Sequence, residues 1–261
     1  MRAPKILMED LRLEYVNDET GVRHLAVEHL DLDVRENEFL CVVGPSGCGK
    51  STLISAIAGF LKPVAGRLEM NRRSIAGPGA DRGVVFQEYA LLPWLTVIDN
   101  VAFGLKMQGQ AKAERHATAR RFLDIANLAE AAEKYPHQLS GGMKQRVAVA
   151  RTLANAPEIM LMDEPFAAVD AQTRMVLQEE LLRIWAGSRV TVLFVTHSVE
   201  EAVFLGDRVA VLTPGPGRVR DIVPVPIGRE RRSWSTLGAD PAFIALRDRV
   251  LHLVRGLEAA A

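Results

Sequence analysis

Alternation of apolar and polar positions predicts strands near the start of the chain. Leu11, Leu13 and Tyr15 alternate with polar residues, and the same two-residue period recurs in Leu30–Val34. This period places every second side chain on one buried face of a strand. Asn17–Gly21 is polar and contains glycine, which predicts a turn between the two strands.

Segments that are apolar at every position predict the buried strands of a central sheet. Such runs are typical of parallel strands, because helices cover both faces of a parallel sheet. They occur at Phe39–Val43, Val84–Phe86, Ile159–Met162, Val192–Val195 and Val209–Leu212.

Helical periodicity separates several of these runs. Leu53–Ala58 carries an apolar helical face and ends before Gly59. Ser198 and Glu201 have the spacing of a capping box at the start of a helix that runs to Leu205. Strands that alternate with helices predict an α/β fold whose main sheet is largely parallel.

The middle of the chain shows helical spacing and no strand pattern. Ala111–Ala132 is rich in Ala, Arg and Glu, and Tyr135-Pro136 ends the helical pattern. We therefore expect a helical insertion at about residues 88–155 within a main domain of residues 1–228. Residues 229–261 form a short tail, whose last helix begins with Asp240 as N-cap and Pro241 as its first residue.

Composition and charge narrow the class of protein. The chain has 261 residues, 48% hydrophobic residues, 25% charged residues and a formal net charge of zero. No apolar run approaches the about 20 residues that span a bilayer, and the first residues lack the pattern of a signal peptide. We therefore expect a protein that does not itself cross a membrane. Only Arg229–Arg232 forms a basic block, which argues against a nucleic-acid partner.

The two cysteines, Cys41 and Cys48, fall in a predicted strand and the loop after it. A disulfide between them is not expected, and the reducing cytosol fits this usage. Cys48 lies in a loop whose N–H groups could lower its thiol pKa, or it is simply a small residue that fits a tight turn.

A glycine-rich loop between a predicted strand and a predicted helix has the P-loop pattern. Its glycines allow the backbone to wrap phosphate groups, its lysine supplies a charge for the β and γ phosphates, and its serine hydroxyl can ligate Mg²⁺. The nucleotide-binding candidates are Gly44, Pro45, Ser46, Gly47, Cys48, Gly49, Lys50, Ser51 and Thr52.

Two carboxylates follow the apolar strand Ile159–Met162. Strand ends are where α/β sheets place ligand-binding groups. Asp163 is expected to hold Mg²⁺, and Glu164, which projects differently, to polarise the attacking water. A solvated acidic turn is the simpler alternative, which the presence of the P-loop disfavours.

A second pair of glycines lies far downstream and opens a predicted helix. The free N–H groups and the positive dipole end of such a helix can hold an anion. The segment comprises Leu139, Ser140, Gly141, Gly142, Met143, Lys144 and Gln145. Two anion sites in one chain, with one nucleotide between them, suggest a site shared by two copies of the chain.

Three single positions are weaker candidates. Gln87 follows the strand Val84–Phe86 and could contact Mg²⁺ or the water. His197 follows another buried strand and could donate to a γ-phosphate, although a lone histidine is more often structural. Tyr15 could stack on adenine or could pack in the core.

These motifs in this order resemble the nucleotide-binding subunit of ATP-binding cassette (ABC) transporters, over almost the whole chain. The resemblance implies a P-loop NTPase (RecA-like) core with an N-terminal antiparallel β subdomain. It makes Tyr15 the adenine-stacking residue, and Gln87, Lys50, Glu164 and His197 catalytic. Mg²⁺ would be held by Ser51, Gln87 and Asp163. Ala168-Val169-Asp170 matches the D-loop, and Leu139–Gln145 matches the signature, with Met143 where glutamine is commonest.

The resemblance also implies partners. Family members work as paired cassettes that bind ATP with Mg²⁺ between one P-loop and the other subunit's Ser140–Gly142 region. We therefore expect a homodimer on an integral membrane permease, at the cytoplasmic face of the plasma membrane, with a solute-binding protein as an indirect partner. Leu91–Val97 with Asp99–Val101, and Pro214–Arg218, look like the importer branch for nitrate, alkanesulfonates and taurine.

Three other functions compete with an importer ATPase. A soluble ABC ATPase acting on nucleic acid or the ribosome usually has paired cassettes, zinc or coiled-coil insertions or basic extensions, which this sequence lacks. A small-molecule kinase would not need the signature segment. An exporter cassette is often fused to membrane spans.

Overall fold

The computed structural model describes residues 4–16, 21–167, 169–188 and 190–258. The chain divides into two compact units, one made of Met1–Gly79 with Val190–Ala261 and the other of Ala80–Arg189. Most of the predicted turn Asn17–Gly21, and Ala168 of the predicted D-loop, lie outside the described residues.

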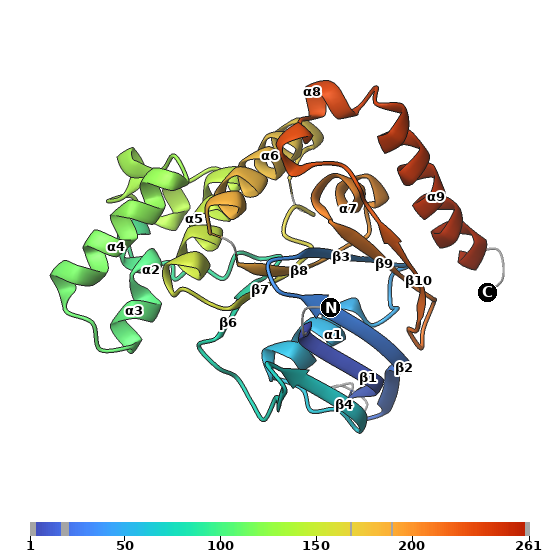
Figure 1. Ribbon diagram of the computed structural model, residues 1–261. Coiled ribbons are helices and arrows are strands. Elements are labelled where there is room, and N and C mark those ends of the chain that lie inside the picture. The colour runs from blue at the N-terminus through green and yellow to red at the C-terminus, as the bar shows by residue number, and fades with distance from the viewer. Residues whose placement is uncertain (1–3, 17–20, 168, 189, 259–261) are drawn as a thin grey trace. The chain divides into compact units, whose positions relative to one another are not determined.

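The first unit contains two sets of strands (Figure 1). One is an antiparallel sheet in the order β2-β1-β4-β5. The elements of this unit are β1 (Pro4–Val16), β2 (Arg23–Arg35), β3 (Phe39–Val43), α1 (Lys50–Ala58), β4 (Ala65–Met70), β5 (Arg73–Ser74), β8 (Thr191–Thr196), α7 (Val199–Leu205), β9 (Arg208–Leu212), β10 (Val219–Pro224), α8 (Trp234–Leu237) and α9 (Pro241–Glu258).

The second set of strands in this unit has β3 at its centre. β3 pairs in parallel with β8 on one side and with β9 on the other, and β10 pairs antiparallel to β9. All five residues of β3 are buried, as its continuous apolar sequence predicts. α7 packs against these strands and α9 against β9 and β10, while α1 contacts β1 and β2. The loop after β3 and the loop after β8 therefore leave the same ends of neighbouring parallel strands.

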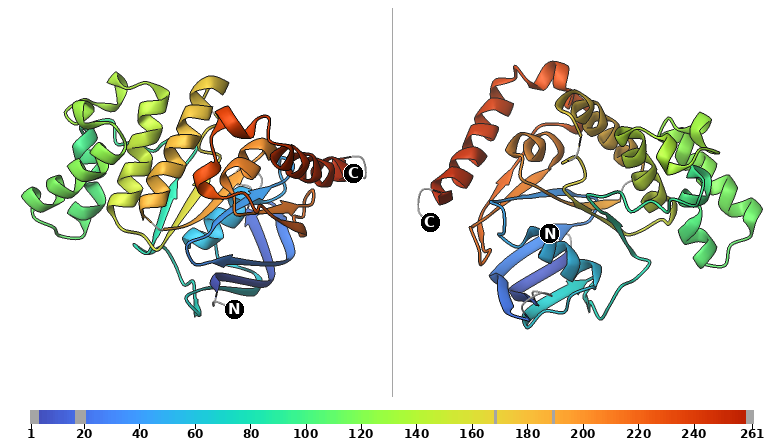
Figure 2. Two further views of the ribbon diagram at one scale, coloured as in Figure 1. Left: turned by 45° about the horizontal axis from the view of Figure 1, so that its top comes forward. Right: turned by 180° about the vertical axis from the view of Figure 1, so that it is seen from behind.

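The second unit is mainly helical (Figure 2). Its two strands, β6 and β7, pair in parallel, and α5 packs against β6 and against α2, α4 and α6. The elements of this unit are β6 (Arg82–Val85), α2 (Val97–Val101), α3 (Phe103–Met107), α4 (Lys112–Ile125), α5 (Gly141–Ala154), β7 (Ile159–Asp163) and α6 (Ala171–Ser188).

The predicted α/β fold class is confirmed, and one local prediction is wrong. The sequence predicts a buried strand over Val84–Phe86, but β6 ends at Val85 and the Phe86 side chain is 41% exposed. Within the helical segment Ala111–Ala132, α4 ends at Ile125, and Asn127 has a φ of 53°, which α-helical backbone does not allow.

Within the described residues, no helix combines the length and the apolar character needed to cross a membrane. The boundaries of the helical insertion, 88–155, and of the tail, 229–261, stay predictions.

Candidate nucleotide site and signature helix

The glycine-rich loop of the first unit joins β3 to α1. Gly49, the N-cap of α1, has a φ of 91°, and a Cβ there would lie 2.6 Å from the carbonyl oxygen of Ala26. The position therefore requires glycine for both its backbone conformation and its close approach to β2. Gly47, at the exposed tip, also has positive φ. The loop is wound tightly, with its N–H groups at the start of a helix, as an anion site requires.

Lys50 lies inside this loop. Its Nζ donates to the carbonyl oxygens of Gly44, at 2.9 Å, and Pro45, at 3.0 Å, and the residue is only 6% exposed. A buried ammonium group needs such partners. The adjacent Ser51 is exposed at the first turn of α1, and a hydroxyl is an oxygen ligand of the kind that Mg²⁺ accepts.

Cys48 is a packing residue in this loop. It is fully buried, and burial raises the pKa of its thiol in spite of the nearby Lys50 ammonium group. The thiol is therefore protonated at neutral pH, and the reading of Cys48 as a small residue in a tight turn is the better one. Cys41 is also buried, and both cysteines are free.

The segment after β9 packs against the P-loop. The backbone of Gly217 is hydrogen-bonded to β2, and a Cβ on Gly217 would lie 2.1 Å from the carbonyl oxygen of Cys48. Arg218 forms an ion pair with Glu28 at 2.5 Å, which fastens the same segment to β2. Pro214–Arg218, the segment that resembles the importer branch, thus lies directly on the P-loop.

Tyr15 and His197 also belong to the first unit. Tyr15 is 45% exposed, so it is not a core residue, and its ring stacks on His24 with centroids 5.3 Å apart. This arrangement leaves an aromatic surface that a base could cover. His197 is exposed directly after β8, at the start of the turn into α7.

The second unit carries both acidic candidates at the end of β7. Asp163 is the last residue of the strand and is half-buried, as is Glu164. Glu164 has a φ of 43°, a left-handed conformation that is uncommon for any residue other than glycine. The strand β7 ends at Asp163, directly before this left-handed residue. Active sites are among the places where such backbone strain clusters.

Gln87 lies in an exposed turn that α5 holds in place. Tyr89 and Ala90, just after it, both have positive φ. Arg151 of α5 donates to the carbonyl oxygens of Tyr89, at 3.0 Å, and Ala90, at 2.6 Å. Burial lowers the pKa of Arg151. Arg151 is not predictable from the sequence, because an arginine in a helix carries no local sign of contacts with residues 61 and 62 positions away.

The signature segment forms the N-terminus of α5. Ser140 is the N-cap and accepts a hydrogen bond from the N–H of Met143, at 3.3 Å. Ser140 and Gly141 are exposed, so the positive end of the 14-residue helix faces outward. Gln145, in contrast, is 1% exposed, and its side-chain amide has no hydrogen-bond partner among the described residues. The outer part of the segment can meet a ligand, while the side chain of Gln145 cannot in this conformation.

Asp170 caps the following helix. Its carboxylate accepts from the N–H of Thr173 at 3.0 Å, and this hydrogen bond lowers the pKa of Asp170. The first unit thus contains Tyr15, the P-loop and His197, and the second unit contains Gln87, Asp163, Glu164, Asp170 and the signature helix.

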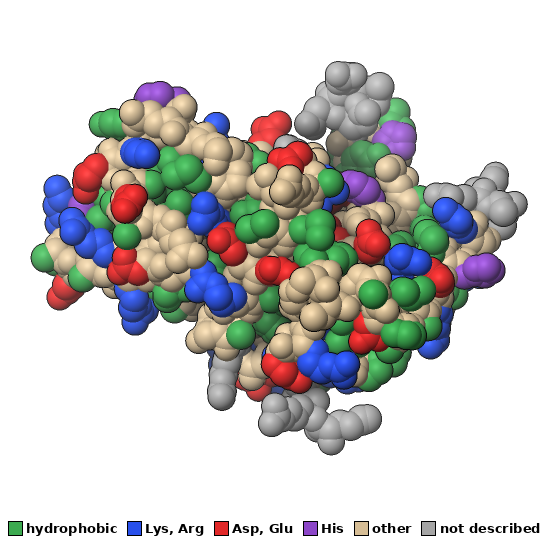
Figure 3. All heavy atoms as spheres, turned by 90° about the horizontal axis from the view of Figure 1, so that it is seen from above, with side chains coloured by type: hydrophobic (Ala, Val, Ile, Leu, Met, Phe, Trp, Pro, Cys, Tyr) green, Lys and Arg blue, Asp and Glu red, His purple; other side chains and the backbone are tan. Residues whose placement is uncertain are grey.

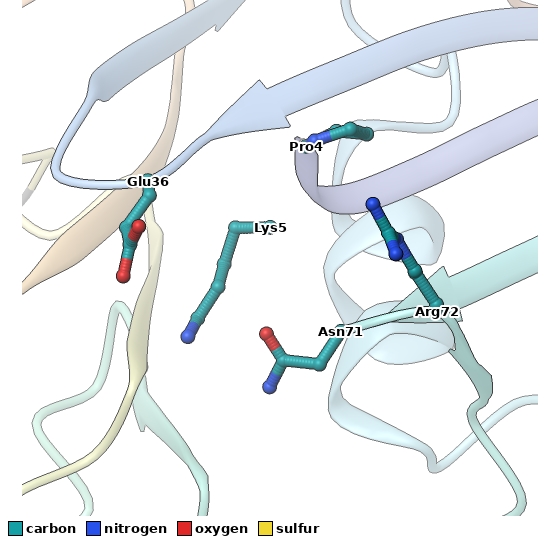
Figure 4. A pocket seen from close by; sticks show the side chains of 5 residues that line it. All are labelled: Pro4, Lys5, Glu36, Asn71 and Arg72. Atoms are coloured by element: carbon teal, nitrogen blue, oxygen red, sulfur yellow. The ribbon is translucent and has the colours of Figure 1, made fainter. Parts of the chain in front are cut away.

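Two further surface features are less informative. On the face shown in Figure 3, acidic and basic side chains are interspersed, so that face has no patch of a single charge. A pocket of about 250 Å³ in the first unit is lined by Pro4, Lys5, Glu36, Asn71 and Arg72. Lys5 and Glu36 point into the same space (Figure 4), and this mixture of charges selects neither anions nor cations.

Residues 27–167, from β2 through the P-loop and the signature helix to the strand with Asp163, match the family model described as ABC transporter. The chain belongs to the ABC transporter family. It is an ATP-binding subunit with ATPase activity, as the resemblance implied.

Named relatives of this ABC subunit match it over most of both chains. An uncharacterized ABC transporter ATP-binding protein of Methanocaldococcus jannaschii is 50% identical, covering 96% of this chain and 92% of the relative. A taurine import ATP-binding protein of Chromobacterium violaceum is 48% identical over 88% of this chain and 90% of its own. A nitrate import ATP-binding protein of Synechocystis is 43% identical over 95% and 94%.

A solved structure supports the cassette fold. It is the dimeric post-hydrolysis state of an ATP-binding cassette bound to ADP and Pi, with 31% identity and a TM-score of 0.72. The match covers 85% of this ABC subunit and 100% of the other chain.

Proposed function

We propose that this chain is the ATP-hydrolysing subunit of an importer that drives uptake of a small solute of the nitrate, sulfonate or taurine type. The observation that carries the proposal is its similarity, over nearly the full length of both chains, to relatives named for import. The sequence resemblance of Leu91–Val97 and Pro214–Arg218 to the same branch adds support.

The residues at the site fit ATP and Mg²⁺. The wound loop and its buried lysine suit phosphates, and a serine hydroxyl, an amide and a carboxylate are oxygen ligands of the kind that Mg²⁺ prefers. Ser51, Gln87 and Asp163 would hold the ion, which neutralises charge on the phosphates when bound. Lys50 would stabilise the charge that develops in the transition state. Glu164 would take the proton of the attacking water, and His197 would donate to the γ-phosphate.

The second proposal is that two copies complete one site. The exposed, serine-capped N-terminus of α5 suits a phosphate that its own unit does not supply. Met143 replaces the usual glutamine, so the contact rests on backbone N–H groups and Ser140. The dimeric solved relative supports this arrangement.

The third proposal concerns the membrane partner. A groove of about 530 Å³ in the second unit lies between β6, α3 and α5, and its lining includes Leu92, Phe103, Met107 and Arg151. Of these lining residues, Met107 is 63% exposed. Exposed apolar side chains around a groove suit a helical segment of a partner protein. We propose that a cytoplasmic segment of the permease docks there, which places the subunit at the inner face of the plasma membrane with a solute-binding protein as an indirect partner and no nucleic acid.

Isolation of the complex tests this function. The tagged chain should copurify with an integral membrane protein from detergent-solubilised membranes. The identity of that membrane protein should in turn identify the solute-binding protein that works with it. That protein should be thermally stabilised by taurine, an alkanesulfonate, nitrate or bicarbonate.

A matched pair of variants tests the docking groove in the same experiment. Met107→Glu should lose the membrane partner, because it introduces a charge into an apolar contact. Met175→Glu, on α6 and 43% exposed, should keep it. Recovery of nucleic acid or ribosomes in place of a permease would contradict the proposed function.

A further inference from the structure

Hydrogen bonds enclose the backbone on both sides of His197. Thr196, the last residue of β8, donates its hydroxyl to the carboxylate of Glu201. The same hydroxyl oxygen accepts from the N–H of Ser198, at 3.0 Å. The N–H of Glu201 donates to the hydroxyl oxygen of Ser198, at 3.3 Å. His197 is thus an exposed residue within a short, closed hydrogen-bonded turn.

The two side chains whose hydrogen bond closes this turn, Thr196 and Glu201, are buried. Thr196 is 2% exposed and Glu201 5% exposed, whereas Glu200, the residue just before Glu201, is exposed. A buried carboxylate is costly unless it is hydrogen-bonded, and its place in the first turn of α7 favours its negative charge. An N-cap needs only the hydroxyl of Ser198, so the buried Thr196–Glu201 pair goes beyond what helix capping requires.

The far end of α7 is also held. Arg232 donates to the carbonyl oxygens of Phe204, at 3.3 Å, and Leu205, at 2.6 Å. With both ends fixed, this seven-residue helix is a firm base for the residue just before it.

We propose that Glu201 and Thr196 are positioning residues for His197. They do not contact the nucleotide; they fix the backbone at residues 196 and 198 and so set the direction in which the imidazole leaves the chain. The inference rests on the proposed role of His197 at the γ-phosphate. We call the hydrogen-bonded pair of Thr196 and Glu201 the clamp. Loss of the clamp should lower the rate of ATP turnover, whereas ATP binding depends on the P-loop and should not change.

Steady-state ATPase kinetics on four variants test the clamp. Glu201→Gln weakens the acceptor, and Thr196→Val removes the hydroxyl with little change of shape. Each should lower kcat about ten- to hundredfold, with KM for ATP within about twofold, because a small misplacement of a catalytic group has effects of that size. Thr196→Ser keeps the hydroxyl and should keep kcat. Glu200→Gln, which alters only the exposed neighbour, should also behave as the unchanged protein.

A double-mutant comparison separates this inference from the proposed function. If Glu201 acts through His197, Glu201→Gln should cause little further loss in a His197→Ala background. An equal loss in both backgrounds would overturn the clamp. Normal turnover in His197→Ala would refute the proposed role of His197 itself, whereas an impaired His197→Ala with a normal Glu201→Gln would refute only the clamp. If Glu201→Gln fails to fold, the Thr196→Val and Thr196→Ser pair decides, and equal kcat in those two would overturn it.

Discussion

At the scale of single residues, Glu164 combines a carboxylate side chain with a strained backbone conformation. Its left-handed φ of 43° costs a non-glycine residue about 1–2 kcal/mol. The sequence nevertheless places a carboxylate there, between Asp163 and Pro165, where glycine or asparagine would relieve the strain. A side chain kept in an unfavourable conformation points to a role that its chemistry alone supplies.

The first prediction at this scale is that Glu164→Gln keeps ATP binding and loses hydrolysis. The amide preserves the shape of the side chain but is a very poor base, so turnover should fall at least about a hundredfold. Binding of a fluorescent ATP analogue and phosphate release, measured on the same preparation, check both parts. Asp124→Asn, at an exposed position of α4, is a suitable control for loss of an acidic charge outside the site. Hydrolysis by Glu164→Gln at the unchanged rate would exclude Glu164 as the general base.

At the scale of elements, the C-terminal segment is fastened to α7 by one buried arginine. Arg232 is 7% exposed and donates to the carbonyl oxygens of Ile227, Phe204 and Leu205, and burial lowers its pKa. Two residues further on, Trp234 stacks on Phe204 with ring centroids 4.2 Å apart. The segment that follows residue 228 is therefore packed onto the first unit.

Replacement of this arginine should destabilise the fold. Arg232→Met removes the donors and leaves buried carbonyl oxygens unpaired, which should lower the free energy of unfolding by about 1–3 kcal/mol. The exposed neighbour Arg231 serves as the control, since Arg231→Met should change the free energy of unfolding by no more than about 0.5 kcal/mol. Chemical denaturation of both variants measures the difference. Equal stability of the two would show that the contacts of Arg232 carry no net stabilisation.

The elements differ in how well the sequence predicts them. β3 and α1 follow from local signals, because an apolar run, glycines and a lysine suffice to specify a strand, a phosphate loop and a helix. β4 and β5 were not predicted, because Ala65–Met70 has neither a clean alternation nor a continuous apolar run. The end of α4 at Ile125 also escaped prediction, since Asn127 takes left-handed backbone without a glycine to announce it.

The residues of the candidate site also differ in how well the sequence predicts them. Lys50, Asp163, Glu164 and Ser140 could be found because each stands at a strand end or helix start with a recognisable neighbourhood. Arg151 and Gly217 could not, because their importance lies in contacts with backbone far away in the sequence. Long-range contacts of this kind appear only once the chain is folded.

At the scale of the whole molecule, the central claim is that the chain cannot complete its ATP site alone. Its P-loop lies in one compact unit and the exposed signature helix in the other. In a twofold-symmetric dimer, the P-loop of each copy would face the signature helix of its partner, which gives two equivalent sites.

Mixing two inactive variants tests this claim most directly. Lys50→Ala removes the phosphate-binding charge, and Ser140→Arg blocks the signature helix, so each variant alone should hydrolyse almost no ATP. In a mixed dimer, one site combines both defects and the other has neither. Random pairing of equal amounts should therefore restore about a quarter of the unchanged activity. A mixture as inactive as its components would contradict a shared site.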